Sequence, residues 1–116
     1  MMKKVLIVED EMIIADMHRD IVEAGGHKVV GIAATSEEAL QFFRLSMPDV
    51  ILMDIYLDDV TDGIETMEAI RKTSQVPVIY ITGNSDDATR QRAEKTNFAA
   101  YLKKPAEPAV LTEAIN

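Results

Sequence analysis

Short apolar runs recur along the chain, separated by longer segments of mixed polarity. The runs are VLIV (5–8), VVGIAA (29–34), VILM (50–53), VIYIT (78–82) and AAYL (99–102). Valine and isoleucine dominate most of them, as is typical of strands that are buried on both faces of a sheet. The pattern therefore predicts five buried β-strands.

Each run is followed by a segment with helical signals. After the first run, Ile14, Met17 and Ile21 recur at helical intervals and Gly25-Gly26 ends the segment. The second helix is predicted by the capping box of Thr35–Glu38, and the third by a start at Asp62–Glu65. Ser85 and the two aspartates after it can cap a fourth helix that reaches about Lys95. Pro108 suits the first position of a fifth helix. Strands that alternate with helices predict βαβ units, and hence an α/β fold with a doubly wound parallel sheet. We expect one domain over residues 1–116.

Composition and charge narrow the possible partners. Twenty acidic residues against twelve Lys and Arg give a formal charge of −8, which argues against direct binding of nucleic acid or of an anionic membrane surface. The chain has no cysteine, which excludes disulfides and thiolate metal sites. The first apolar run is too short for a signal peptide and no segment approaches transmembrane length, so we expect a cytoplasmic protein.

Polar residues stand where the predicted strands end. Glu9 and Asp10 follow the first strand, Asp54 follows the third, Thr82 ends the fourth and Lys104 closely follows the fifth. In open α/β sheets, sites form beyond the carboxyl ends of the strands. A solvated turn at a helix start could account for the first two acids alone. It does not account for the Asp, Thr and Lys at the same edge, so we expect a site there.

These motifs resemble the receiver domain of two-component response regulators, the CheY-like family. They are the acid pair in VLIVEDE, the Asp in VILMDIYL, the Thr-Gly in YITG and the Lys-Pro in YLKKP. The resemblance covers nearly the whole chain and implies a flavodoxin-like sheet of five parallel strands in the order 2-1-3-4-5. The chain departs from the family pattern in two ways. Glu9 stands where Asp is usual, and the loop after Asp54 is longer and lacks the frequent Met-Pro.

The resemblance implies a phosphoacceptor in a phosphorelay. Asp54 would take a phosphoryl group from a histidine kinase or phosphotransfer protein, in a reaction that depends on Mg²⁺. Asp10, Asp54 and the backbone carbonyl of Tyr56 would bind the ion, with Glu9 acting directly or through water. Mg²⁺ prefers a coordination shell in which a few protein oxygens are ligands and water molecules fill the remaining positions.

The remaining roles also follow from the resemblance. Lys104 and Thr82 would contact phosphoryl oxygens; Lys104 is preferred to its neighbour Lys103 because a cis bond to Pro105 would aim it inward. Thr82 and Tyr101 would form a switch that changes a protein-interaction surface toward an output domain or protein. The domain would have no separate turnover substrate, so we do not expect an enzyme.

The lifetime of the phosphoryl group is a further expectation. Tyr56 and Asn84 should flank the open side of Asp54, where bulk at Tyr56 would hinder the water that hydrolyses the phosphate. Slow self-dephosphorylation is therefore predicted.

Other functions fit the sequence less well. A phosphatase of the haloacid dehalogenase type also uses an Asp nucleophile and Mg²⁺, but needs a second Asp where this chain has Tyr56. A nucleotide or flavin site needs a glycine-rich turn where this chain has EDEM. An interaction domain that is never phosphorylated would not require the Asp, Thr and Lys set. His18 and His27 lack companion ligands, and we interpret them as surface or packing residues.

Overall fold

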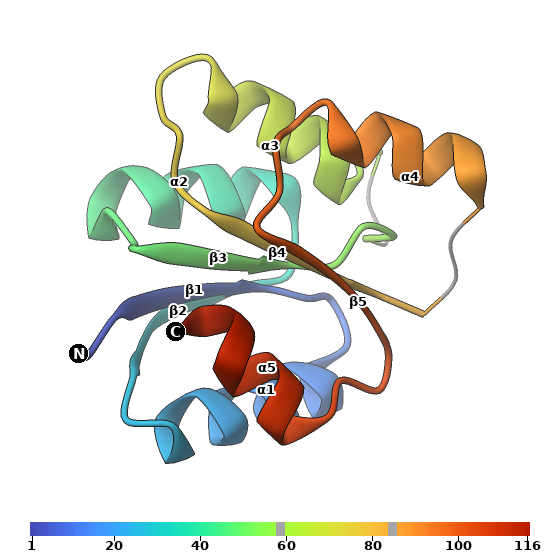
Figure 1. Ribbon diagram of the computed structural model, residues 1–116. Coiled ribbons are helices and arrows are strands. Elements are labelled where there is room, and N and C mark those ends of the chain that lie inside the picture. Colours follow the sequence, from blue (N-terminus) through green and yellow to red (C-terminus); the bar gives the residue numbers. More distant parts are fainter. Residues whose placement is uncertain (58–59, 84–85) are drawn as a thin grey trace.

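The computed structural model describes residues 1–57, 60–83 and 86–116, and in these residues five strands alternate with five helices (Figure 1). The elements are β1 (Lys4–Val8), α1 (Met12–Ala24), β2 (Lys28–Ala33), α2 (Ser36–Ser46), β3 (Val50–Met53), α3 (Gly63–Arg71), β4 (Val78–Thr82), α4 (Asp87–Glu94), β5 (Ala100–Lys103) and α5 (Pro108–Ile115). Every predicted strand is present, with its ends within one residue of the predicted ends.

The sheet has the strand order that the family resemblance implied. Its order is β2-β1-β3-β4-β5, and each neighbouring pair is parallel. The chain moves outward from β1 to β2 and then crosses back to β3 on the other side of β1. Polar residues that follow β1 and β3 are thereby brought to adjacent places at one edge of the sheet.

Two helical layers cover the sheet, with α1 and α5 on one face and α2, α3 and α4 on the other (Figure 1). Strand residues alternate between these layers because side chains of a strand point to opposite faces. In β1, Leu6 and Val8 belong to the core under α2 and α3, whereas Val5 and Ile7 belong to the core under α1 and α5. Burial on both faces explains the apolar runs of the inner strands β1, β3 and β4. The edge strands β2 and β5 are mostly half-buried, so the prediction of buried strands is wrong for these two, which lack a neighbouring strand on one side.

Side-chain caps fix the starts of three helices. The Thr35 hydroxyl accepts from the Glu38 amide at α2, and the Glu38 carboxylate binds the amide of Ala34. At α3, Asp62 and Glu65 form a complete capping box. Asp86 caps α4 by accepting from the Thr89 amide, while Ser85, a predicted cap, lies outside the described residues. None of the helices in the described segments is long and apolar enough to cross a membrane.

Candidate functional site

The carboxyl edge of the sheet brings Glu9, Asp54 and Lys104 into contact. The Lys104 ammonium lies 2.7 Å from Glu9 Oε1 and 3.3 Å from Asp54 Oδ2. Glu9 is 1% exposed and Asp54 is 6% exposed, so these charges meet in a nearly dry environment. The backbone amide of Lys104 donates to the carbonyl of Thr82 at 2.9 Å, which fixes the lysine beside the end of β4.

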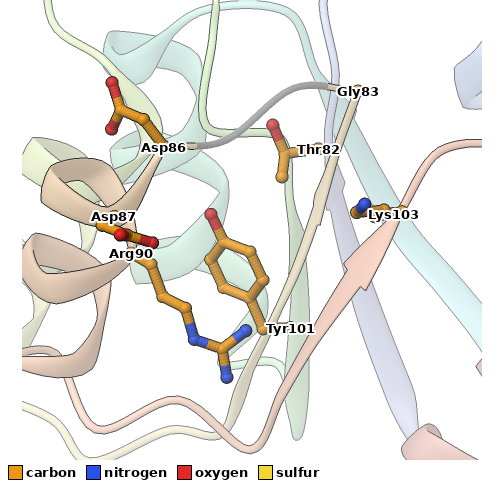
Figure 2. Close-up of a pocket in the computed structure, with 7 residues that line it drawn as sticks. All are labelled: Thr82, Gly83, Asp86, Asp87, Arg90, Tyr101 and Lys103. Atoms are coloured by element: carbon orange, nitrogen blue, oxygen red, sulfur yellow. The ribbon is translucent and has the colours of Figure 1, made fainter.

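The two neighbouring lysines have opposite orientations. Lys104 points into the acidic site, and its bond to Pro105 is cis, as predicted. Lys103 is exposed and lines a different pocket, on the side of β5 that faces α4 (Figure 2). The structure therefore agrees with the choice of Lys104 over Lys103 as the lysine that faces Asp54.

Burial and mutual contact shift the titration of all three groups. Removal from water raises the pKa of Glu9 to about 7, against the opposing effect of the Lys104 contact. Burial likewise raises the pKa of Asp54, although Lys104 opposes the shift. For Lys104, burial alone would lower the pKa, but the contacts with Glu9 and Asp54 outweigh it and raise the pKa. The ammonium is therefore firmly charged and offsets part of the repulsion between the acids.

Three carboxylates are arranged as a group that could hold a cation. Glu9, Asp10 and Asp54 each offer one oxygen, and these oxygens all lie within 4.8 Å of one another. Opposite oxygens around Mg²⁺ lie about 4.2 Å apart, so a small contraction would suffice. Both oxygens of Glu9 already have partners, because Oε1 contacts Lys104 and Oε2 accepts from the Glu11 amide at 3.1 Å. The donor set fits a hard cation, with Glu9 the least available ligand.

Thr82 and Tyr101 lie at the border of a second hollow beside this edge. Its volume is about 260 Å³, and its lining consists of Thr82, Gly83, Asp86, Asp87, Arg90, Tyr101 and Lys103 (Figure 2). The hydroxyl end of Tyr101 points toward the end of β4 that carries the buried Thr82 (Figure 2). The Arg90 guanidinium lies over the Tyr101 ring, 4.8 Å from its centroid. The pair predicted as a switch is thus brought together, with a cation from α4 stacked on it.

Comparison with known proteins decides the family. The profile of the response regulator receiver domain matches residues 5–116. The chain belongs to this family. Receiver domains of two-component response regulators are phosphoacceptors, so the predicted family, fold and class of function are confirmed.

Individual receiver domains show how far the similarity extends. The phyllosphere-induced regulator PhyR of Methylorubrum extorquens is 37% identical over 118 residues, which cover 100% of this chain and 43% of that protein. The signal receiver domain of a modulated diguanylate cyclase from Desulfovibrio desulfuricans has a TM-score of 0.92 and 36% identity, covering 99% of this chain and 91% of that one. A CheY-like receiver protein from Methanospirillum hungatei has a TM-score of 0.89 and 30% identity, with 99% and 91% coverage. The chain spans less than half the length of PhyR.

The sequence analysis assigned no site role to Thr89, Arg90 or Gly63, which the structure places beside predicted site residues. The Tyr56 hydroxyl donates to Thr89 Oγ1 on α4 at 3.2 Å, and Arg90 stacks on Tyr101. Gly63 begins α3 directly against the backbone of Asp54, where a β-carbon would overlap the Asp54 carbonyl oxygen. Its sequence signal, Asp-Gly at a helix start, indicated only the helix boundary.

The two histidines of the receiver domain are packing residues. His18 is 5% exposed and His27 is 6% exposed, so of the two alternatives, surface or packing, the structure supports packing. Burial and the nearby charge of Lys104 lower the pKa of His18. His27 accepts from the Lys3 amide through Nδ1 and contacts the Asn116 side chain through Nε2. Asn84, which was expected to flank Asp54, lies outside the described residues.

Proposed function

We propose that Asp54 of this receiver domain accepts the phosphoryl group, from a phosphohistidine of a histidine kinase or phosphotransfer protein. The observation that carries the proposal is the convergence of the Lys104 ammonium and the other acids on the nearly buried Asp54 carboxylate. A carboxylate is a weak nucleophile, and it must approach an anionic donor. The site therefore has to cancel negative charge rather than generate a strong base.

The residues around Asp54 supply this neutralisation. A carboxylate oxygen of Asp54 attacks the phosphorus, the phosphorus–nitrogen bond of the donor breaks, and the nitrogen keeps its electron pair. Lys104 is already held at the edge of Asp54 and would bind a phosphoryl oxygen with its ammonium. Thr82, fully buried at the end of β4, would donate its hydroxyl to another. Such positioned charges and donors act mainly on the transition state.

Mg²⁺ is the cofactor that the acidic group would hold. Asp10 and Asp54 would bind it with their carboxylates and Tyr56 with its backbone carbonyl, while Glu9 would act through water because its oxygens are engaged by Lys104 and Glu11. When bound, the ion supplies positive charge to the phosphoryl oxygens.

The signal would leave the site through Thr82 and Tyr101. Movement of Thr82 toward a phosphoryl oxygen would make room for Tyr101, and the ring would carry the change to the surface formed by α4, β5 and α5. This is a local charge event that biases an element with two arrangements. The receiver of two-component systems modifies itself, so we propose no separate turnover substrate. A downstream output domain or protein would read the surface. That this receiver domain is cytoplasmic, and that it forms one domain over residues 1–116, stay predictions.

Mass spectrometry after incubation with acetyl phosphate and Mg²⁺ tests the proposal. The wild-type chain should gain one phosphoryl group that maps to Asp54, and Asp54→Asn should gain none. Asp16→Asn, an exposed aspartate on α1 whose partner is Arg19, is the matched control and should be labelled like the wild type. Equal labelling of Asp54→Asn would show that another residue accepts the group.

A further inference from the structure

We infer that Thr89 of α4 is a positioning residue for the phosphorylation site: by holding the Tyr56 side chain, it slows the hydrolysis of the phosphoryl group on Asp54. The inference rests on the proposed function of Asp54. It adds a residue from a helix that contributes no group to the acidic site itself, and it makes the lifetime of the phosphorylated form depend on where α4 lies.

Tyr56 is bound at both of its ends. Its backbone amide donates to Asp54 Oδ1 at 3.3 Å, and its hydroxyl donates to Thr89 Oγ1 at 3.2 Å. The side chain therefore spans from the end of β3 to the first turn of α4. Tyr56 is 48% exposed, so packing alone does not fix its rotamer. The hydroxyl contact to Thr89 is the interaction that anchors the far end of the ring.

Thr89 is itself held in place within the first turn of α4. It is 9% exposed, and its amide donates to the capping carboxylate of Asp86 at 2.7 Å. One turn further, Arg92 pairs with Asp62 at 3.0 Å, which ties the same helix to the start of α3. Residues three apart lie on one face of a helix. The loop that follows Asp54 is thus fastened to one face of α4 at both of its ends.

The position of the Tyr56 ring bears on hydrolysis. A water oxygen attacks the phosphorus in line with the bond to Asp54, that bond breaks, and its electron pair returns to the carboxylate as orthophosphate leaves with the protons of the water. A ring held between the end of β3 and the first turn of α4 would occupy part of the space that this water must cross. Release of the hydroxyl lets the ring swing toward solvent, and the path opens. A partner that displaces α4 would free the ring in the same way.

A double-mutant cycle on the decay of the phosphorylated protein tests this role. Tyr56→Phe and Thr89→Val each remove one side of the contact, and each should speed decay by about threefold to tenfold, the range expected for one hydrogen bond. The double variant should decay no faster than either single variant, because both remove the same contact. Thr89→Ser keeps the hydroxyl and should restore slow decay. Gln91→Ala, at an exposed position of the same helix, is the control for changes in α4.

The possible outcomes separate the two ideas. If the wild type takes up no phosphoryl group at Asp54, the proposed function fails. If it does and the single variants decay at the wild-type rate, only the role of Thr89 fails. If Thr89→Val speeds decay equally in the Tyr56→Phe background, the threonine acts through the stability of α4 and the inference is wrong. Tyr56→Phe changes a half-exposed side chain, so the test stands even where Thr89→Val folds poorly.

Discussion

Two neighbouring regions of this receiver domain are held together by different forces. The acid–lysine cluster, formed by Glu9, Asp10, Asp54 and Lys104, rests on charges that are mostly buried and in direct contact. The α4–β5 face, formed by α4, Phe98 and β5, rests on stacked rings and a cation: Arg90 lies 4.8 Å from the Tyr101 centroid and 5.7 Å from that of Phe98. We therefore expect the first region to respond to added charge and the second to rearrange at small cost.

Helix burial shows the same contrast. In α3 the buried residues are Gly63, Ile64, Thr66, Met67 and Ile70, whereas in α4 they are only Thr89 and Ala93 among the residues described for that helix. α4 therefore contributes little to the core and is held by polar and cation–π contacts, each worth about 0.5–1.5 kcal/mol. A helix held in this way suits an element that must move when the site changes charge.

The largest expected effect separates the two lysines. Lys104→Ala removes the cation that faces Asp54, and the rate of phosphoryl uptake should fall about a hundredfold, as for the loss of one positioned charge in a buried site. Lys103→Ala is the matched control and should change the rate less than about twofold, since exposed charges contribute little. The rate is followed by mass spectrometry with acetyl phosphate. A larger loss for Lys103→Ala would mean that the wrong lysine has been assigned to the cluster.

The next effect is a pH dependence of stability in the absence of metal. The pKa of Glu9 is raised by burial to about 7 from an ordinary value of 4.5, so the folded state binds the proton more tightly than the unfolded state. This stabilisation is fully present below pH 4.5 and is lost as the pH rises through about 7. The loss should amount to about 1–3 kcal/mol.

Urea unfolding in chelator-treated buffer at pH 5 and pH 8 measures this dependence. The Glu9→Gln variant mimics the neutral acid, so the free energy of unfolding of the wild type should fall relative to that of the variant as the pH rises. A difference that stays constant across this range would show that Glu9 does not titrate there.

Mg²⁺ should stabilise the folded protein by a smaller amount. Only the folded chain brings Asp10 and Asp54 together, so only the folded state binds the ion at this site. A free Mg²⁺ concentration of about ten times the dissociation constant raises the free energy of unfolding by about 1.4 kcal/mol. Thermal melts with and without millimolar Mg²⁺ should therefore differ by several degrees in the wild type. Asp10→Ala should show little or no shift. An equal shift in both proteins would place the bound ion elsewhere.

The smallest expected effect lies on the α4–β5 face. Arg90→Met keeps an unbranched apolar chain but removes the cation over Tyr101, and should destabilise the protein by about 0.5–1 kcal/mol. Arg19→Met, whose exposed pair with Asp16 is 3.0 Å long, is the control and should cost less. Chemical unfolding gives both values. Equal losses would mean that stacking on Tyr101 contributes no more than a surface ion pair.

The sequence could predict the parts of this fold that depend on local pattern. The inner strands β1, β3 and β4 are buried on both faces, so each appears as an apolar run, and Asp62–Glu65 carries its capping box in four residues. Edge residues such as Asp54 and Lys104 could be grouped because parallel strands deliver their carboxyl ends to one edge. The strand order itself came from the family resemblance, since spacing alone does not decide it.

The contacts that were not predicted depend on side-chain positions in three dimensions. Glu9 was expected to serve the metal, yet its Oε1 lies 2.7 Å from Lys104, a pairing of residues 95 positions apart that no local pattern encodes. The Tyr56–Thr89 contact depends on how α4 lies against the loop after β3. α4 has too few apolar residues for periodicity to fix that placement.

The glycine at the start of α3 has a consequence for how sequence variation should be interpreted. A mutational scan scored only by phosphoryl transfer would rank position 63 with the reactive residues, although it has no side chain to react. The restriction there is one of volume, because any larger residue would displace the backbone of Asp54 and move its carboxylate. Compensation would need a shifted helix rather than a different functional group. Position 63 should therefore tolerate exchange only together with changes in the packing of α3.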